Sequence, residues 1–81
     1  MEQMSDSTAQ KLQGALITSA ELLRQTSNDA LLLDNVKKQI REVRTMNFSP
    51  EQSEVTAAIL EYCEKIVGKV QTGMLLMDQL S

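Results

Sequence analysis

The C-terminal segment, residues 73–80, reads Gly-Met-Leu-Leu-Met-Asp-Gln-Leu and constrains the fold more than any other part of the chain. It continues a helical pattern that begins near Pro50. Because successive residues of an α-helix lie about 100° apart, the four apolar residues 74–77 point in four different directions. A helix that is apolar all round is not a surface helix. These turns therefore need cover on more than one side.

The size of the chain limits how that cover is supplied. A chain of 81 residues forms one domain, at a length where one hydrophobic core is marginal and oligomerisation is a common remedy. The single cysteine excludes an internal disulfide, and the absence of histidine argues against a structural zinc site. We expect a single domain over residues 1–81 that is oligomeric and has no metal and no cofactor.

The charge and the N-terminal residues narrow the class of protein. A net charge of −3 opposes nucleic-acid binding at the level of the whole chain. Residues 1–6 lack the basic and apolar regions of a signal peptide, and no run approaches the roughly 18 apolar residues of a membrane span. A lone cysteine is typical of a reducing compartment. We expect an acidic, cytoplasmic protein without a membrane partner.

The composition predicts an all-α protein. Leu, Ala, Glu, Gln, Lys and Met, which favour helices, are abundant, and runs of β-branched and aromatic residues are absent. We predict three helices over residues 8–25, 29–46 and 50–80, with residues 1–6 disordered. The predicted fold is an antiparallel three-helix bundle or a helical hairpin with a long C-terminal helix.

Capping residues set the predicted boundaries. Ser7 is a plausible N-cap of the first helix, with Gln10 as its capping-box partner. Residues 26–29 form a break in which several side chains could cap the second helix. Asn47 is suited to the left-handed conformation that ends a helix. Ser49 then caps a third helix whose first residue is proline and whose box partner is Gln52.

Each predicted helix carries an apolar stripe at helical spacing. The first stripe is Ala9, Leu12, Leu16, Ala20 and Leu23. The second is Leu32, Leu33, Val36, Ile40 and Val43. The third is Val55, Ile59, Tyr62, Cys63, Ile66, Val70, Met74 and Met77.

The third helix is too long for the other two to cover. At ~1.5 Å per residue it spans ~45 Å, against ~27 Å for each of its neighbours. Its methionine- and leucine-rich end stays uncovered unless the first helix packs there, and Gly73 would let another helix approach closely. We predict that a partner contacts Ile66, Val70, Gly73, Met74, Leu75, Leu76, Met77 and Leu80.

A basic face on the second helix offers a different surface, formed by Lys37, Lys38, Arg41 and Arg44. It contacts an acidic partner or phosphate groups, or it is an ordinary solvated face. The second interpretation is favoured, because antiparallel packing would bring Arg41 and Arg44 near Glu51 and Glu54. Nucleic-acid binding also lacks the aromatic residues that usually accompany it.

No set of residues predicts catalysis. Cys63 lies on an apolar stripe without a histidine to activate it, so a buried hydrophobe is the better interpretation. Glu61 and Glu64 lack the histidine of the Glu-x-x-His metal motif. We expect a protein that is not an enzyme.

These observations predict a small protein–protein interaction module that acts through its apolar C-terminal helix. An adaptor, an assembly factor, a small chaperone and an inhibitor of a larger protein all fit this description, and the partner is a second copy or a different protein. The alternative is a nucleic-acid-binding regulator that uses the basic face of the second helix.

Overall fold

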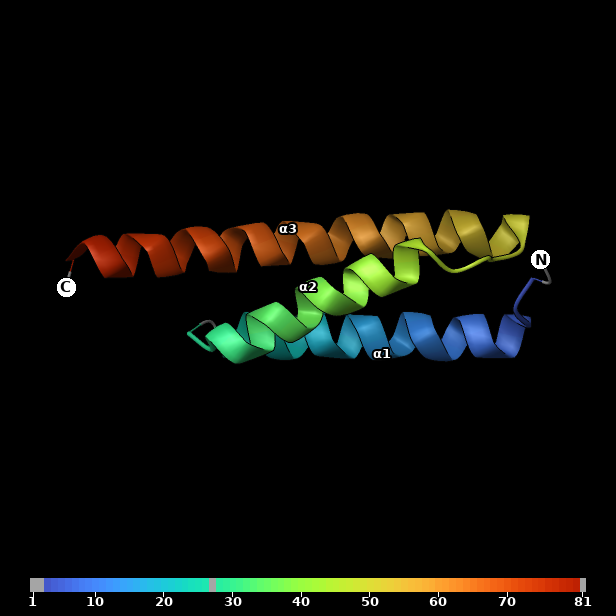
Figure 1. The fold of residues 1–81 in the computed structure, drawn as a ribbon, viewed down its shortest axis with the longest axis horizontal. Coiled ribbons are helices and arrows are strands. Elements are labelled where there is room, and N and C mark those ends of the chain that lie inside the picture. Colours follow the sequence, from blue (N-terminus) through green and yellow to red (C-terminus); the bar gives the residue numbers. More distant parts are fainter. Residues whose placement is uncertain (1–2, 27, 81) are drawn as a thin grey trace.

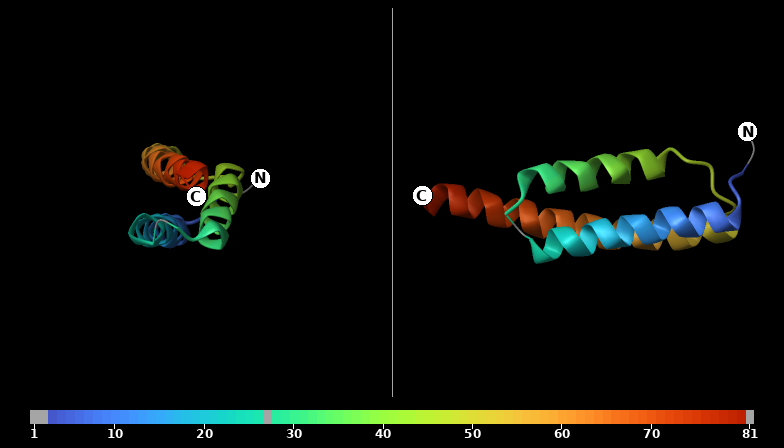
Figure 2. Two further views of the ribbon diagram at one scale, coloured as in Figure 1. Left: turned by 90° about the vertical axis from the view of Figure 1, so that its left-hand side faces the viewer. Right: turned by 90° about the horizontal axis from the view of Figure 1, so that it is seen from below.

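The computed structural model describes residues 3–26 and 28–80, which form three helices packed into one bundle (Figure 1). The helices are α1 (Asp6–Gln25), α2 (Ala30–Arg44) and α3 (Pro50–Leu80). Helices α1 and α3 run in the same direction, α2 runs against both, and the end view shows them at the corners of a triangle (Figure 2). The all-α prediction is confirmed, and the arrangement is a bundle rather than a two-helix hairpin.

The core lies along the common axis, where the apolar stripes of the three helices meet. Leu16 and Leu23 on α1, Val36 on α2 and Cys63 on α3 are its largest fully buried side chains. Phe48, in the connection before α3, packs against the same cluster. The other members of the cluster are Ala20, Leu33, Ile40, Val43, Leu60, Ile66, Val67 and Val70.

Helix α1 begins earlier than the sequence predicts. Ser5, not Ser7, is the N-cap, and its side-chain oxygen accepts the backbone N–H of Thr8 at 3.2 Å. The acidic Asp6 then lies in the first turn, where it favours the positive end of the helix dipole. The backbone N–H of Met4 donates to the carbonyl of Asn47 at 3.0 Å. Residues 4–6, predicted to be disordered, are therefore held in the fold, whereas residues 1 and 2 lie outside the described part of the chain.

Helix α2 is capped by Asp29, whose carboxylate accepts the backbone N–H of Leu32 at 3.0 Å. The helix ends two residues earlier than predicted, because Thr45 closes it with hydrogen bonds from both its backbone N–H and its hydroxyl to the carbonyl of Glu42. None of the described residues has a positive φ, so the left-handed stop predicted at Asn47 is wrong. The carbonyl of Asn47 instead accepts the bond from the N-terminal segment.

The start of α3 uses the predicted N-cap, Ser49, but the side chain of Gln52 does not act as its box partner. The backbone N–H of Gln52 donates to the Ser49 hydroxyl, at a long 3.4 Å. The side-chain oxygen of Gln52 accepts from Gln13 of α1 at 2.9 Å, rather than turning back to the cap. The same Gln13 amide nitrogen donates to the hydroxyl of Thr56 at 3.1 Å.

These polar contacts turn the buried face of α3 away from the predicted stripe. Thr56 is 4% exposed, whereas the neighbouring Val55 is 46% exposed. Further along the helix Leu60 and Val67 are buried, and Tyr62 is 45% exposed. The hydrophobic pattern cannot identify Thr56 as an inward position, because its buried hydroxyl is satisfied by a glutamine on another helix.

The three helices have very different lengths. Helix α3 has 31 residues, against 20 for α1 and 15 for α2. Helices α1 and α3 start at the same end of the bundle, so the C-terminal part of α3 extends past both neighbours (Figure 1). The molecule is accordingly elongated, measuring 50 × 17 × 15 Å. We call residues 71–80 the α3 overhang.

Candidate functional site

The α3 overhang brings four exposed large apolar side chains together within six residues of one helix. Four of its large side chains are exposed: Leu75 is 60% exposed, Leu76 55%, Met77 56% and Leu80 88%. Val70, immediately before the overhang, is 6% exposed. Neither α1 nor α2 reaches these turns, so the core of this chain does not provide their cover (Figure 1).

The other predicted partner-binding residues lie closer to the core. Ile66 and Val70 belong to the core cluster and support the helix without offering a surface. Met74 is partly buried and packs against that cluster, and Gly73 is also partly buried. The accessible part of the predicted site therefore starts at Gly73.

A shallow groove leads from the body of α3 into the overhang, lined by Lys65, Gly68, Lys69, Thr72, Gly73 and Leu76. The small residues Gly68, Thr72 and Gly73 form the bottom of the groove. A Cβ atom added at Gly68 or Gly73 would meet nothing within 4 Å. Within the chain, then, Gly73 does not allow the close helix contact that the sequence suggests.

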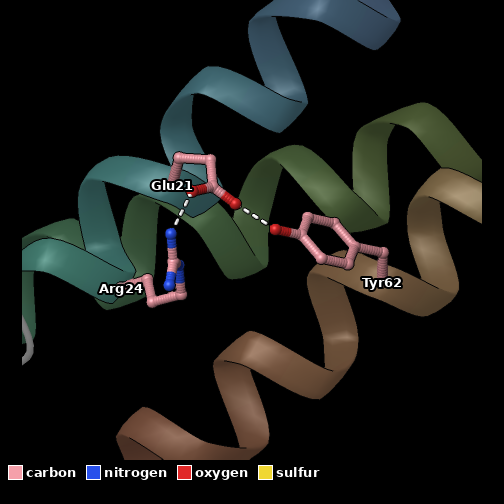
Figure 3. Close-up of polar contacts among 3 residues, drawn as sticks. All are labelled: Glu21, Arg24 and Tyr62. Carbon is pink, nitrogen blue, oxygen red and sulfur yellow. Dashed lines mark hydrogen bonds and ion pairs between the residues drawn. The ribbon is translucent and has the colours of Figure 1, made fainter.

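A hydrogen-bonded group joins α1 to α3 beside this groove (Figure 3). The Tyr62 hydroxyl donates to the carboxylate of Glu21, which is also paired with Arg24 at 2.7 Å. These two donors hold the pKa of Glu21 below its ordinary value, the hydrogen bond from Tyr62 having the larger effect. The same bond raises the pKa of the Tyr62 phenol. Arg24, Tyr62, Lys65, Ile66 and Lys69 line a second hollow between the two helices.

The basic face of α2 is narrower than the sequence suggests. Lys38 and Arg41 are exposed and Lys37 is half-buried. The Arg44 guanidinium pairs with Glu64 of α3. The described residues show no ion pair between Arg41 or Arg44 and the predicted partners Glu51 and Glu54.

The connection between α2 and α3 explains this difference in register. Residues 45–49 run alongside the bundle before α3 starts, so the end of α2 lies opposite the middle of α3 (Figure 1). Arg44 therefore reaches Glu64 rather than the first turn of α3.

Cys63 is a core residue in this fold. It is fully buried, and its Sγ lies 3.9 Å from the carbonyl oxygen of Leu16. Burial raises the pKa of the thiol, which disfavours the reactive thiolate.

Within residues 3–26 and 28–80, no three acidic or cysteine side chains are close enough to hold a metal ion. In the same part of the chain, no helix combines the length and the apolar character needed to cross a bilayer. The described surface thus offers the apolar overhang and its groove as the main candidate site.

Sequence reasoning found the overhang but missed two features beside it. It placed Tyr62 on the buried stripe, although a Tyr followed three residues later by Lys is also compatible with an exposed face. It also overlooked the groove, for which the spacing of Gly68, Thr72 and Gly73 was the available signal. Comparisons with family models, with curated proteins and with solved structures find no match to the chain.

Proposed function

We propose that the protein is a protein–protein interaction module whose binding surface is the α3 overhang. The observation that supports this most directly is that Leu75, Leu76, Met77 and Leu80 are each more than half exposed on consecutive turns of one ordered helix. Contiguous apolar surfaces of this type mark interaction sites on soluble proteins.

The energetics favour a partner that buries several of the exposed side chains of the overhang. Fully burying one leucine or methionine side chain contributes about 1.5–3 kcal/mol, and the overhang exposes four such side chains. A flat surface would cover only one side of the helix, such as the side shared by Leu76 and Leu80. The methionine supplies a flexible side chain that adapts to different partner shapes. An adaptor, an assembly factor, a small chaperone or an inhibitor fits this surface better than an enzyme does.

The alternative, a nucleic-acid-binding regulator, has less support. One of its four cations, Arg44, already pairs with Glu64, and Lys37 is half-buried. Two exposed cations on a chain with a net charge of −3 supply little attraction for a phosphate backbone.

A photo-crosslinking amino acid placed at Leu76 tests the proposal in cells that produce the protein. The matched control carries the same amino acid at Lys38, which is exposed on α2 and far from the overhang. Folding of both variants is checked by circular dichroism.

We expect adducts from the Leu76 position and none of comparable yield from Lys38, because only the first position lies in the binding surface. The mass of each adduct then gives the partner: twice 9.0 kDa for a second copy, and another value for a different protein. A folded Leu76 variant that gives no adduct would overturn the proposed function.

A further inference from the structure

The charges of α3 are separated along its length. Residues 50–64 contain four glutamates and no basic residue. Residues 65–80 contain Lys65, Lys69 and a single acid. Two such helices placed side by side in the same direction would put like charges together. Placed in opposite directions, they bring the acidic half of one next to the basic half of the other.

One flank of α3, on the side next to α1, carries a regular series of residues. Val55, Tyr62, Lys69 and Leu76 follow one another at intervals of seven, the repeat that keeps residues on one face of a paired helix. All four are exposed, and Tyr62 lies on the side of α3 from which it reaches Glu21 of α1. We call this series, together with Ala58, Glu61, Lys65 and Gly73, the outer face of α3.

We propose that the outer face of α3 is a homodimer interface, in which a second copy packs its own α3 antiparallel about a two-fold axis near residues 65 and 66. This inference rests on the proposed function, because it names the partner that covers the side of the overhang with Leu76. It also extends the binding surface from the overhang to the whole length of α3.

The pairing follows from the positions of the residues about that axis. Val55 lies opposite Leu76 of the second copy, so that two exposed apolar side chains cover each other. Ala58 lies opposite Gly73, where one methyl group and no second side chain allow the backbones to approach. Tyr62 lies opposite Lys69, and its ring is held at the surface by the hydrogen bond to Glu21.

Charged residues lie at the centre of the interface, near the two-fold axis. The two Lys65 side chains meet near the axis, which alone would be repulsive. Glu61 offsets this, because its carboxylate lies 3.7 Å from the Lys65 ammonium of the same copy. Glu61 of each copy also faces Lys69 of the other copy, so the two-fold symmetry gives two Glu61–Lys69 ion pairs.

The surface area that the dimer would bury favours pairing along the whole of α3 over pairing through the overhang alone. Ten residues of helix, ~15 Å long and ~10 Å wide, would cover only about 300 Å² over both copies. Pairing over residues 51–80 covers about 900 Å² by the same reasoning, in the range of weak and transient protein interfaces. We therefore expect a dimer that forms at high protein concentration and dissociates on dilution.

Charge reversal on the outer face tests the proposal. The purified full chain, the variants Glu61→Lys and Lys69→Glu, and an equal mixture of the two are compared by sedimentation velocity over a range of concentrations. Each variant alone should stay monomeric, because it faces itself with like charges. The mixture should dimerise more strongly than either variant alone, because each residue 61 then faces an opposite charge at residue 69 of the other chain. Lys38→Glu, a matched charge change on α2, should leave the dimer unchanged.

Engineered cysteines test the antiparallel direction, and the buried Cys63 is retained. An oxidised mixture of Val55→Cys and Leu76→Cys should give a covalent dimer joining one chain of each type. Neither variant alone should do so, since identical positions would be ~31 Å apart in the antiparallel pair, far beyond the reach of a disulfide. Covalent dimers from Val55→Cys alone would show a parallel pair and overturn the proposal.

Failure of this inference is distinguishable from failure of the proposed function. A chain that remains monomeric at all concentrations, while the Leu76 crosslinker still captures a different protein, overturns the homodimer and keeps the interaction module. A monomeric chain without any Leu76 adduct overturns both.

Discussion

At the scale of single residues, a polar contact sets how α1 meets α3. The buried amide of Gln13 donates to two acceptors on α3, Gln52 and Thr56, at 2.9 and 3.1 Å. A shift of α3 by one residue would break both hydrogen bonds. This shift is unfavourable, because it would leave the buried amide of Gln13 unpaired. The pair of helices therefore has one favoured register, which hydrophobic contacts alone would define less sharply.

This contact predicts strong coupling between Gln13 and Thr56. Gln13→Leu should lower the free energy of unfolding by about 1–3 kcal/mol, since it leaves the buried Thr56 hydroxyl without its partner. Thr56→Val should cost about 1 kcal/mol, because Gln13 keeps Gln52. The double variant should be more stable than the sum of the single effects implies, as measured by urea unfolding. Additive effects would contradict the role assigned to this contact.

The Tyr62 phenol offers a spectroscopic test of the contact shown in Figure 3. It is the only tyrosine, so the near-ultraviolet absorbance of its phenolate reports one group. Its hydrogen bond to the Glu21 carboxylate raises its pKa, so we expect an apparent pKa above the ordinary value of about 10. Glu21→Gln should lower this pKa, because it removes the negative charge. An identical titration in both proteins would show that the bond does not persist in solution.

The sign of this shift also gives a dependence of stability on pH. Because the folded-state pKa of Tyr62 is raised, the contribution of the bond is complete below the unfolded pKa and is lost as the pH rises through the folded value. The pKa of Glu21 is lowered, so its contribution is lost in acid, as the pH falls through its folded value. The link between α1 and α3 is therefore strongest between these limits.

Residue identities explain which parts of the core could be predicted from the sequence. Four of the five predicted stripe residues of α1 are buried. Leucine and alanine at helical spacing form a single apolar face, and burying that face in the core is favourable. On α3 the apolar pattern is ambiguous, since valine, isoleucine and tyrosine occur on two adjacent faces. The choice between Val55 and Thr56 depends on Gln13, a residue 43 positions from Thr56 that no local pattern connects to it.

At the scale of elements, the glycines of α3 lower the stability of this helix. A glycine inside a helix costs about 0.5–1 kcal/mol relative to alanine. Gly14 on α1 and Gly73 on α3 both have open space where a Cβ would lie, so each could be replaced without a clash inside the chain. The cost at Gly73 has no compensation within one copy and would be compensated in the proposed dimer.

Alanine at these two positions should therefore act differently on folding and on association. Both Gly14→Ala and Gly73→Ala should stabilise the dilute monomer by up to ~1 kcal/mol, as measured by urea unfolding. Only Gly73→Ala should weaken the dimer in sedimentation, because its new methyl group meets Ala58 of the second copy. Equal association of the two variants would argue against close approach at Gly73.

The boundaries of the elements were less predictable than their existence. Ser5 and Ser7 both satisfy the requirements of an N-cap, and the sequence alone does not rank them. What favours Ser5 is tertiary: the bond from Met4 to the carbonyl of Asn47 holds the preceding segment against the connection before α3. That same connection shifts Arg44 from Glu51 to Glu64, a register that helix lengths and caps do not encode.

At the scale of the whole molecule, the bundle and the overhang differ in what maintains them. The core cluster ends near Val70, with Met74 packed at its edge, so the three-helix body forms its core without the last turns of α3. The sequence predicted this division from the unequal helix lengths. It could not predict the outer face, because exposure on α3 depends on where α1 and α2 lie against it.

This division predicts that the overhang contributes to association and little to folding. In the dilute monomer, Leu75→Ser together with Leu76→Ser should change the free energy of unfolding by less than about 1 kcal/mol, because both side chains are already exposed. The matched core variant Val67→Ser should cost several times more, since it places a hydroxyl at a position 9% exposed.

Sedimentation at high concentration completes this test. The double serine variant should lose the dimer while its circular dichroism stays that of the unmodified chain, because Leu76 faces Val55 in the pair. If the monomer were instead destabilised as strongly as by Val67→Ser, the last turns would belong to the core of a single copy. The apolar overhang would then be a structural element that folds back in solution, and the binding surface would have to be sought elsewhere on the bundle.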